Sequence, residues 1–391
     1  MIYVGIDVSK DKHDCCILSS DGQTLLKPFS VPNNIEGFHT LASAIASFKK
    51  NPNEVKVGLE ATGHYSFNIL GYLLEKDYNC FVFNPLHTNL YRKSLTLRKT
   101  KTDKVDSKII AKMLLSEVDF KPYSKALYNN EQLKSLSRYR FSKIRERSNL
   151  KQQLARLVNI LFPELEKLVP SLHLSSVYAL LEEFPGASFI AKSHLTKLTN
   201  LLCTYSKGHY KREKTLEIRN AAIHSIGCIM PAKSLELKHT IQLIRILSDE
   251  IDEIESQIQE IMAKINSPIT SIPGLGFRMA AIILSEIGDF SNFDSPDKIL
   301  AFAGISPSTY QSGKLDNAYS HMEKRGSRYL RYALYNAAVY VCNWDKTFAA
   351  YLQKKRSEGK HYYVALSHAI KKLVRVIFHL QTTGDTYISA V

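Results

Sequence analysis

The chain has 391 residues, with 52 lysines and arginines against 37 aspartates and glutamates, a formal net charge of +15 and a pI near 9.3. Its 45% hydrophobic content is ample for buried cores, and no apolar run approaches the length that spans a bilayer. The composition therefore predicts a globular, basic protein that binds nucleic acid and has no membrane segment.

Two further classes of protein are excluded by local patterns. The N-terminus leads directly into a strand, without the basic leader and hydrophobic block of a signal peptide, so we expect a cytoplasmic, nucleoid-associated protein. The six cysteines show neither CxxC nor Cys/His zinc spacing. They are therefore expected to be reduced, mostly packed thiols rather than disulfides or metal ligands.

Residues 1–125 alternate strand and helix signals and form the first predicted domain. The predicted elements are strands at 2–7, 14–19 and 24–31, a helix at 35–49, a strand at 55–60, a helix at 65–75, a strand at 79–83 and a helix that enters a basic run. Three hairpin strands followed by βαβα is the order of an RNase H-like mixed α/β sheet. In that sheet the first and fourth strands are expected to end side by side.

Two acidic residues lie at those strand ends. Asp7 closes the first predicted strand and Glu60 closes the fourth. Burying a carboxylate costs several kcal/mol unless a cation or hydrogen bonds compensate. The two side chains therefore predict a shared cation site.

A second acidic pair, Asp103 and Asp106, lies at the start of a predicted helix at 106–116. The pair is also explained by an N-cap and a favourable helix dipole, and capping is compatible with metal binding. Mg²⁺ prefers a few carboxylates completed by water and phosphate oxygens, and a pair of such ions clamps a scissile phosphate. We therefore interpret Asp7, Glu60, Asp103 and Asp106 as ligands of Mg²⁺ and as catalytic residues.

A dense basic run surrounds the second acidic pair. Its members are Arg92, Lys93, Arg98, Lys99, Lys101 and Lys104. A helix cap does not explain this charge, whereas a polyanion held against the acids would require it. These residues are predicted to bind nucleic acid.

Residues 126–267 are predicted to be helical, with a coiled-coil seam. The seam consists of Leu237, Ile244, Leu247, Ile251, Ile254, Ile258, Ile261 and Ile265, with one gap at Thr240. An earlier leucine-rich helix, interrupted by Arg140, Lys143 and Arg147, is its expected partner, either in the same subunit or across a dimer. Residues 170–232 show no motif.

Residues 268–391 form a third predicted domain with two candidate phosphate contacts. The turn Pro273-Gly274-Leu275-Gly276 precedes an apolar helix at 279–287 and resembles a helix-hairpin-helix element, although a purely structural turn has the same pattern. The basic turn with Lys324, Arg325 and Arg328 precedes an aromatic-rich helix at 332–344. Gly274, Gly276 and these three cations are predicted to contact nucleic acid.

Several motifs in a fixed order resemble a known family. GIDVSKDKHD, GLEATGHY, NPLHTNLYRKS, TDKVDSKIIA, SIPGLG, FAGISPSTYQSG and KRGSRYLRYALYNAA together resemble the DEDD transposases of the insertion-sequence 110 family, which are related to the Piv DNA invertase. The similarity covers residues 1 to about 125 and about 268 to 380, whereas the middle matches only as a helical coil.

The resemblance implies a RuvC-like N-terminal domain whose acidic tetrad matches Asp7, Glu60, Asp103 and Asp106. It also implies a C-terminal transposase domain whose nucleophilic serine matches Ser312. Family members recombine donor and target DNA under the guidance of a structured non-coding RNA. They assemble as dimers of dimers with shared active sites, so a homo-oligomer is expected.

Two other functions remain open from the sequence. One is a RuvC-like nuclease or junction resolvase that activates water with the same carboxylates and needs no serine. The other is a non-catalytic DNA-bridging protein in which Asp7 would be replaceable.

Overall fold

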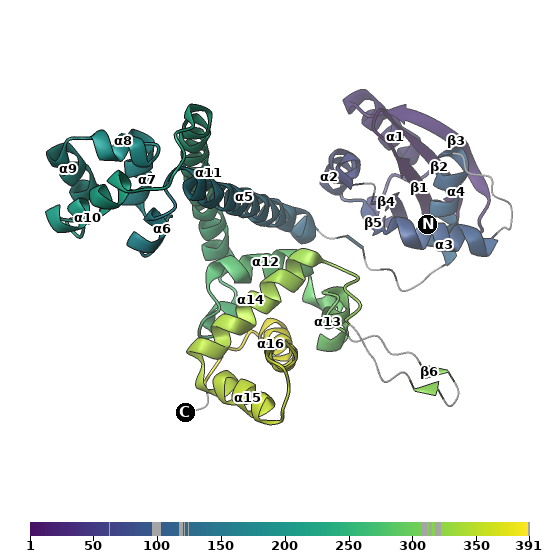
Figure 1. Cartoon of the computed structure of the whole chain (residues 1–391). Coiled ribbons are helices and arrows are strands. Elements are labelled where there is room, and N and C mark those ends of the chain that lie inside the picture. The colour runs from purple at the N-terminus through teal and green to yellow at the C-terminus, as the bar shows by residue number, and fades with distance from the viewer. Residues whose placement is uncertain are drawn as a thin grey trace. The chain divides into compact units, whose positions relative to one another are not determined.

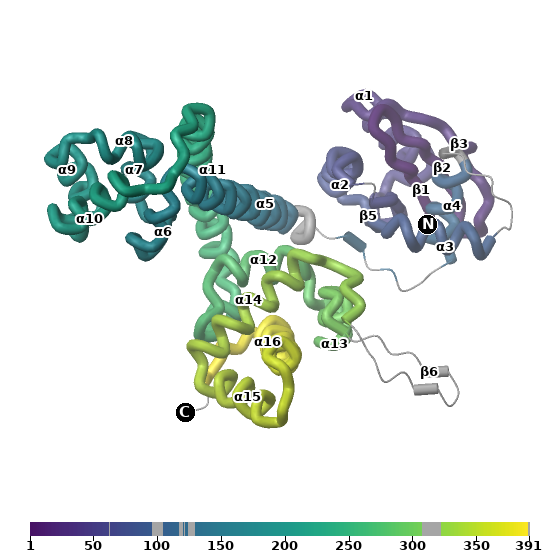
Figure 2. The backbone as a smooth tube through the Cα atoms, viewed as in Figure 1, coloured from purple at the N-terminus to yellow at the C-terminus, as the bar shows by residue number. Residues whose placement is uncertain are grey.

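The computed structural model describes the chain except residues 62, 96–102, 117–119, 121, 124, 307–310, 313–314, 317–321 and 390–391. For residues 103–104, 125–129, 311–312 and 315–316 it describes the backbone alone. The chain divides into two compact units, one formed by residues 1–132 with 288–294 and the other by 133–287 with 295–391. Figures 1 and 2 show the course of the backbone in each. The predicted three-domain division stays a prediction.

The first unit is built on a five-stranded mixed sheet in the order β3-β2-β1-β4-β5. Its elements are β1 (Ile2–Val8), β2 (Lys12–Ser19), β3 (Thr24–Pro32), α1 (Ile35–Ala46), η1 (Pro52–Glu54), β4 (Val55–Glu60), η2 (Gly63–Tyr65), α2 (Ser66–Glu75), β5 (Asn79–Phe83), α3 (Pro85–Leu95) and α4 (Asp103–Ser116). Strand β1 is antiparallel to β2 and parallel to β4. The predicted mixed sheet, with the first and fourth strands adjacent, is therefore confirmed.

Helices cover both faces of this sheet (Figure 1). On one face, Val4 and Ile6 of β1 share a core with Leu41 of α1 and Leu73 of α2. On the other face, α4 packs against β1, β2 and β4. Because both faces are buried, β1 and β4 are nearly continuous apolar runs, and a polar residue at their ends stands out.

Two long helices, α5 (Lys125–Leu161) and α11 (Pro231–Ile265), pair antiparallel within the same chain. Arg140 bonds to Glu255, Lys143 to Glu250, and Gln153 to Glu236. Residues later in α5 therefore pair with residues earlier in α11, as in an antiparallel pair. The cations that interrupt the leucine pattern of α5 therefore bond to its partner helix. The expected partnership is found within one subunit.

The predicted seam of α11 is buried from Leu237 to Ile258 and then shifts by one residue. Met262 is buried in place of Ile261, and Ile265 is 44% exposed, so the predicted seam is wrong at its C-terminal end. A straight α-helix drifts by about 20° per heptad relative to a 3.5-residue repeat, which moves the buried face from one residue to the next.

The residues between α5 and α11 form a helical module that packs against the ends of these two helices. Its helices are α6 (Leu165–Leu168), α7 (Ser175–Glu183), α8 (Ala187–Lys192), α9 (Leu195–Tyr205) and α10 (Arg212–Ile223). Their apolar residues share one hydrophobic cluster with the end of α5 and the start of α11, for example Leu180, Leu202, Leu157 and Leu237. Residues 170–232, which show no sequence motif, therefore contribute a packed module.

The rest of the second unit is a helical bundle around α14. Its elements are η3 (Pro268–Ser271), α12 (Phe277–Ile287), α13 (Pro296–Phe302), the two-residue strands β6 (Gln311–Ser312) and β7 (Leu315–Asp316), α14 (Arg328–Trp344), α15 (Lys346–Ser357) and α16 (Tyr362–Thr383). The short helix η4 (Phe290–Asn292), between α12 and α13 in sequence, belongs to the first unit. Helix α14 packs against α12, α15 and α16. In the described part of the chain, no helix is long and apolar enough to cross a membrane.

Candidate active site

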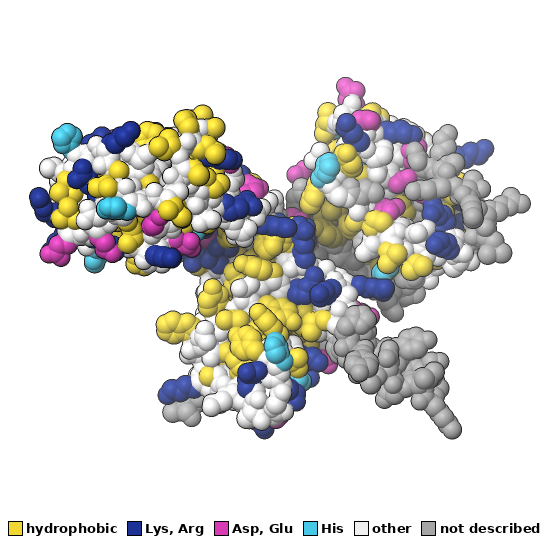
Figure 3. Space-filling model, viewed as in Figure 1, with side chains coloured by type: hydrophobic (Ala, Val, Ile, Leu, Met, Phe, Trp, Pro, Cys, Tyr) yellow, Lys and Arg dark blue, Asp and Glu magenta, His cyan; other side chains and the backbone are white. Residues whose placement is uncertain are grey.

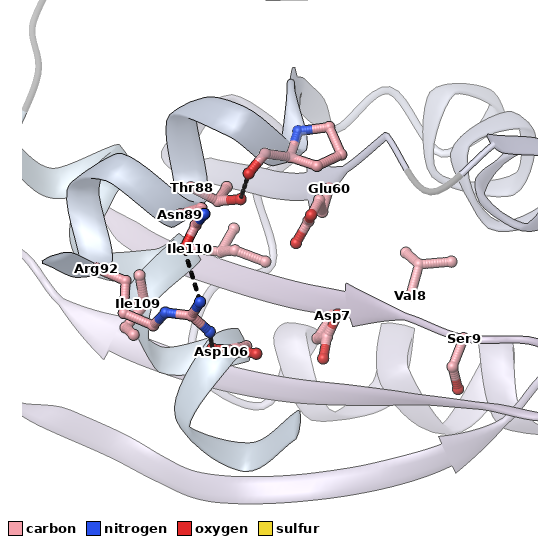
Figure 4. Close-up of a pocket in the computed structure, with 11 residues that line it drawn as sticks. Asp7, Val8, Ser9, Glu60, Thr88, Asn89, Arg92, Asp106, Ile109 and Ile110 are labelled. Atoms are coloured by element: carbon pink, nitrogen blue, oxygen red, sulfur yellow. Dashed lines mark hydrogen bonds and ion pairs between the residues drawn. The ribbon is translucent and has the colours of Figure 1, made fainter. Parts of the chain in front are cut away.

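Asp7 and Glu60 lie at neighbouring strand ends on the edge of a pocket in the first unit. The parallel register pairs Ile6 of β1 with Leu59 of β4, so the next residue along each strand is an acid. Both side chains line a pocket of about 390 Å³, together with Asp106, Arg92 and Asn89 (Figure 4). The two strand-end acids therefore line the same pocket, as expected from the sequence.

Two glycines bring α4 close enough to the sheet to place Asp106 in this pocket. A Cβ atom on Gly5 would lie 2.1 Å from the carbonyl oxygen of Ser107 and 2.5 Å from the amide nitrogen of Ala111. On β4, a Cβ on Gly58 would lie 2.9 Å from the side chain of Ile110. Only glycine permits so close an approach of helix and strand.

Asp106 is held by Arg92, which the sequence predicts as a nucleic-acid contact. The Arg92 Nη1 atom lies 3.3 Å from Asp106 Oδ1, and Arg92 Nη2 donates to Asn89 Oδ1 at 2.7 Å. Arg92 therefore belongs to the pocket, where its guanidinium is paired with Asp106. Lys93 is exposed on α3, whereas Arg98, Lys99 and Lys101 lie outside the described residues.

Asp103 is the first residue of α4, which begins three residues earlier than predicted. Its side chain lies outside the described part of the chain. Its backbone position is one helical turn before Asp106, so the two residues share one side of the first turn. Its catalytic role stays a prediction, as do those of Asp7, Glu60 and Asp106.

The donor set suits a hard divalent cation in type. Carboxylate oxygens with room for water and phosphate are what Mg²⁺ prefers, and the pocket supplies both. As the described side chains stand, however, no three histidine, cysteine, aspartate or glutamate residues form a group that could hold a metal ion. Asp106 is engaged by Arg92, so binding of an ion would require this ion pair to rearrange.

Ser312 lies in the second unit, on the short strand β6, which pairs with β7 through Ser312 and Leu315. Its side chain is outside the described part of the chain. The two ends of this segment are joined at its base. Ser327 N donates to Phe302 O at 3.0 Å, and Arg331 Nη1 donates to the carbonyl of Ala303 at 2.9 Å. The described residues on either side of this segment, 302–306 and 322–327, are therefore joined by hydrogen bonds, and we call them the stalk.

The basic turn before α14 is anchored by a buried glutamate that sequence reasoning missed. Arg138 Nε donates to Glu286 Oε1 at 2.6 Å, and Ser327 Oγ donates to Glu286 Oε2 at 2.7 Å. Ser327 also caps α14 by accepting from Leu330 N. Burial alone would raise the pKa of the Glu286 carboxyl, but the bonds from Arg138 and Ser327 bring it below its ordinary value. Lys324, Arg325 and Arg328 are exposed beside this anchor.

The two glycines of the turn Pro273-Gly274-Leu275-Gly276 differ in how strictly the surrounding structure requires glycine. Gly274 has a φ of +86°, and a Cβ there would lie 2.7 Å from the carbonyl oxygen of Tyr340, so packing against α14 requires glycine. Gly276 has open space at its Cβ position. Packing therefore explains the glycine at position 274 but not the one at position 276, where the predicted phosphate contact stays a prediction.

Some of these residues carry a sequence signal and others do not. Gly5 and Gly58 stand two residues before Asp7 and Glu60, a repeated Gly-x-acid pattern that marks a crowded strand end. Glu286 and Arg138 are far apart in sequence and follow no motif, so only the fold brings them together.

Comparison with known proteins places the chain among insertion-sequence proteins. Residues 4–163 match the DEDD transposase family of the IS110 type. Residues 266–353 match a second family, described as "Transposase IS116/IS110/IS902 family". The chain is 24% identical over 383 residues to the pilin gene-inverting protein of Moraxella bovis, covering 96% of this chain and 94% of that one.

Two further relatives come from insertion elements. The "Insertion element IS116 uncharacterized 44.8 kDa protein" of Streptomyces clavuligerus is 23% identical over 385 residues, covering 96% of this chain and 94% of that one. The "Insertion element IS900 uncharacterized 42 kDa protein" of Mycobacterium paratuberculosis is 22% identical over 393 residues, covering 99% and 97%. The chain belongs to the IS110 family of DEDD transposases and is a DNA transposase, or recombinase.

Proposed function

We propose that this transposase cleaves, exchanges and rejoins DNA strands with a metal-binding carboxylate centre and a serine nucleophile. The observation that carries the proposal is the pocket shared by Asp7, Glu60 and Asp106. Its acids come from two adjacent parallel strands and from the helix packed across them. This arrangement, with strand order β3-β2-β1-β4-β5, supports an RNase H-like, RuvC-like catalytic domain.

We assign Mg²⁺ to Asp7, Glu60, Asp103 and Asp106. When bound there, the metal would neutralise charge on the scissile phosphate. The protein's own part is to hold the carboxylates at one edge of the sheet and to keep a counter-cation, Arg92, within reach of Asp106. That guanidinium can move from the carboxylate to a phosphate oxygen when a polyanion enters, because it forms charge-assisted bonds with either group.

Ser312 is the proposed nucleophile. Its Oγ–P bond forms as the bond from phosphorus to the departing deoxyribose oxygen breaks, the serine proton passes to solvent, and the departing oxygen takes up a proton. The phosphoserine bond retains the energy of the broken link, so attack by the hydroxyl of a new strand rejoins DNA without ATP. The segment 308–314 contains neither an acid nor a histidine, so Ser312 must use the carboxylate centre.

The proposed partners are donor and target DNA, a structured guide RNA and further copies of the chain. A net charge of +15 supports binding of both nucleic acids. Because the proposed partner is DNA, we also propose that the protein is associated with the nucleoid. A relative named for inverting a pilin gene supports cleavage with rejoining, because inversion requires two breaks to be resealed in exchanged order.

An exposed apolar stripe on α11 supports assembly with another copy. Leu235, Leu243 and Ile246 are 56%, 48% and 53% exposed. They lie on one side of the helix, away from the residues that pack against α5. Three large aliphatic side chains in water along one helix mark a contact surface, and a second α11 would match it.

The test is to trap protein joined to DNA on a substrate with the element's ends. Wild-type protein should yield a covalent adduct that Ser312→Ala abolishes, whereas the control Ser306→Ala, in the stalk of the same segment, should retain it. Asp7→Asn should remove cleavage and leave DNA binding largely intact, because affinity comes mainly from the basic surface. Cleavage without an adduct in Ser312→Ala would instead identify a nuclease that activates water.

A further inference from the structure

Helix α14 presents a row of aromatic and polar side chains away from its packed side. Tyr332, Asn336, Tyr340 and Trp344 follow at four-residue intervals. Each step advances about 400° around an α-helix, so the four side chains stay within an arc of about 120°. The opposite side, for example Leu334, Ala338 and Val341, is fully buried. We call these four residues the aromatic face.

Two residues of the aromatic face are strongly exposed, whereas Tyr332 and Asn336 are half-buried. Trp344 is 74% exposed and Tyr340 is 49% exposed. On the side of the second unit seen in Figure 3, hydrophobic side chains gather near α12 and α14, with lysines and arginines beside them. Large aromatic rings left in water mark a binding surface, because their burial against a partner is strongly favourable.

A pocket of about 440 Å³ opens between the aromatic face and the start of α12. Its walls include Tyr332, Asn336, Tyr340, Phe277, Arg278 and Arg140. The Asn336 amide nitrogen donates to Tyr332 O at 2.8 Å, which fixes a polar group within an aromatic wall. Flat aromatic surfaces with a few fixed polar groups are the chemistry that holds a nucleobase.

Positive charge accompanies the rings. Arg140 and Arg278 share the single carboxylate of Glu255, at 2.5 Å and 2.6 Å, so this part of the pocket carries one excess positive charge. Half of the Arg278 side chain remains exposed. At the N-terminal end of α14, the guanidiniums of Arg138 and Arg328 both lie 4.8 Å from the Tyr329 ring centre. An anionic partner with planar groups complements this surface better than an apolar protein partner does.

We propose that the aromatic face and its pocket bind unpaired DNA nucleotides, with one base in the pocket and a neighbouring base stacked on Trp344. A duplex keeps its bases paired and stacked, so it cannot use these rings, whereas every unpaired base has a free aromatic surface. The choice of DNA over RNA rests on the proposed function. Helix α14 starts directly after the stalk on the C-terminal side of Ser312, and a DNA strand opened at Ser312 is therefore the single strand that we assign to this surface.

Trp344 is the single tryptophan of the chain, so the intrinsic tryptophan fluorescence of the whole protein reports this surface alone. Titration with an oligodeoxythymidylate should quench it saturably. A duplex of equal length should quench it far less at matched salt. Tyr340→Ala should weaken binding of the single strand about tenfold, in the range measured for loss of one stacking ring. Phe189→Ala, which removes a similarly exposed ring from α8, should not change the affinity.

Three results would overturn the inference: equal quenching by the duplex, tighter binding of the matching oligouridylate, and a change of Trp344 emission on dilution of the protein alone. The last would show that a second copy covers the face. Ser312→Ala and Asp7→Asn proteins should bind the oligonucleotide normally. Formation of the phosphoserine adduct without single-strand binding would therefore end this inference and leave the proposed function standing.

Discussion

Gly5 and Gly58 set how closely α4 can approach the sheet, and thereby where Asp106 lies. Gly5 faces the backbone of α4, at Ser107 and Ala111, whereas Gly58 faces the side chains of Ile110 and Leu114. A flexible side chain can yield by a few tenths of an ångström, but the backbone of a packed helix cannot. Gly5 is therefore the stricter of the two positions.

Gly5→Ala is expected to displace α4, to lower the free energy of unfolding by about 1–3 kcal/mol and to abolish strand cleavage. Thermal unfolding and a cleavage assay measure both effects. Gly276→Ala is the matched stability control, because an added Cβ there has no heavy atom within 4 Å. Unchanged melting temperature and cleavage in Gly5→Ala would contradict this account of the site.

Glu286 is expected to make stability depend on pH in the acid range. Its lowered pKa means that its carboxylate contributes stability above the pKa of the unfolded chain, and that this contribution is lost as the pH falls through the lower, folded value. Glu286→Gln should cost about 1.5–3 kcal/mol at neutral pH, because charge-assisted bonds to Arg138 and Ser327 are lost.

Urea unfolding of both proteins over a range of pH checks this. The loss on acidification should be smaller in Glu286→Gln than in the wild type. Exposed Glu323 gives the control, and its change to Gln should alter neither stability nor the pH profile. Parallel pH profiles for wild type and Glu286→Gln would show that the buried network contributes nothing.

At the scale of elements, the pairing of α5 with α11 is a separate source of stability. Ile251 and Ile258 are buried on the seam of α11. Changing both to Asn is expected to cost roughly 2–5 kcal/mol at each position and to disrupt assembly before chemistry. Chemical unfolding and measurement of the oligomeric mass test this. Unchanged mass and activity would show that the contact is not required for either.

The exposed stripe of α11 gives a contrasting variant. Leu243→Asn with Ile246→Asn should leave stability nearly unchanged, because these side chains already face water in the single chain. If the stripe binds a second copy, the same pair should lower the oligomeric mass. A mass equal to the wild type would rule out the stripe as the contact between copies.

For the whole molecule, the proposed catalytic groups fall in two compact units, with Asp7 in one and Ser312 in the other. We predict that Ser312 of one subunit works with the carboxylates of a partner. Mixing Ser312→Ala with Asp7→Asn protein should then restore part of the activity, because some assemblies contain one complete site. Absence of rescue, with both variants shown to co-assemble, would count against shared sites.

The sequence alone determined the local features of this protein. Apolar alternation located the strands of the first unit, and their order predicted that β1 and β4 would be neighbours, because such patterns depend on residues close together in the chain. Asp7 and Glu60 could be identified in the same way, since a charge at the end of a buried strand stands out from its neighbours. The ordered motifs identified the family.

The tertiary structure decided what depends on packing between distant segments. The close approach of α4 to Gly5, the Arg92–Asp106 pair and the Glu286–Arg138 bond join elements that no periodicity connects. The end of the α11 seam also shifted from Ile261 to Met262, because helix geometry departs from a strict heptad. Hydrophobic patterns specify which side of an element is buried, but the partner on that side, and the charges that meet there, follow only from how the elements pack.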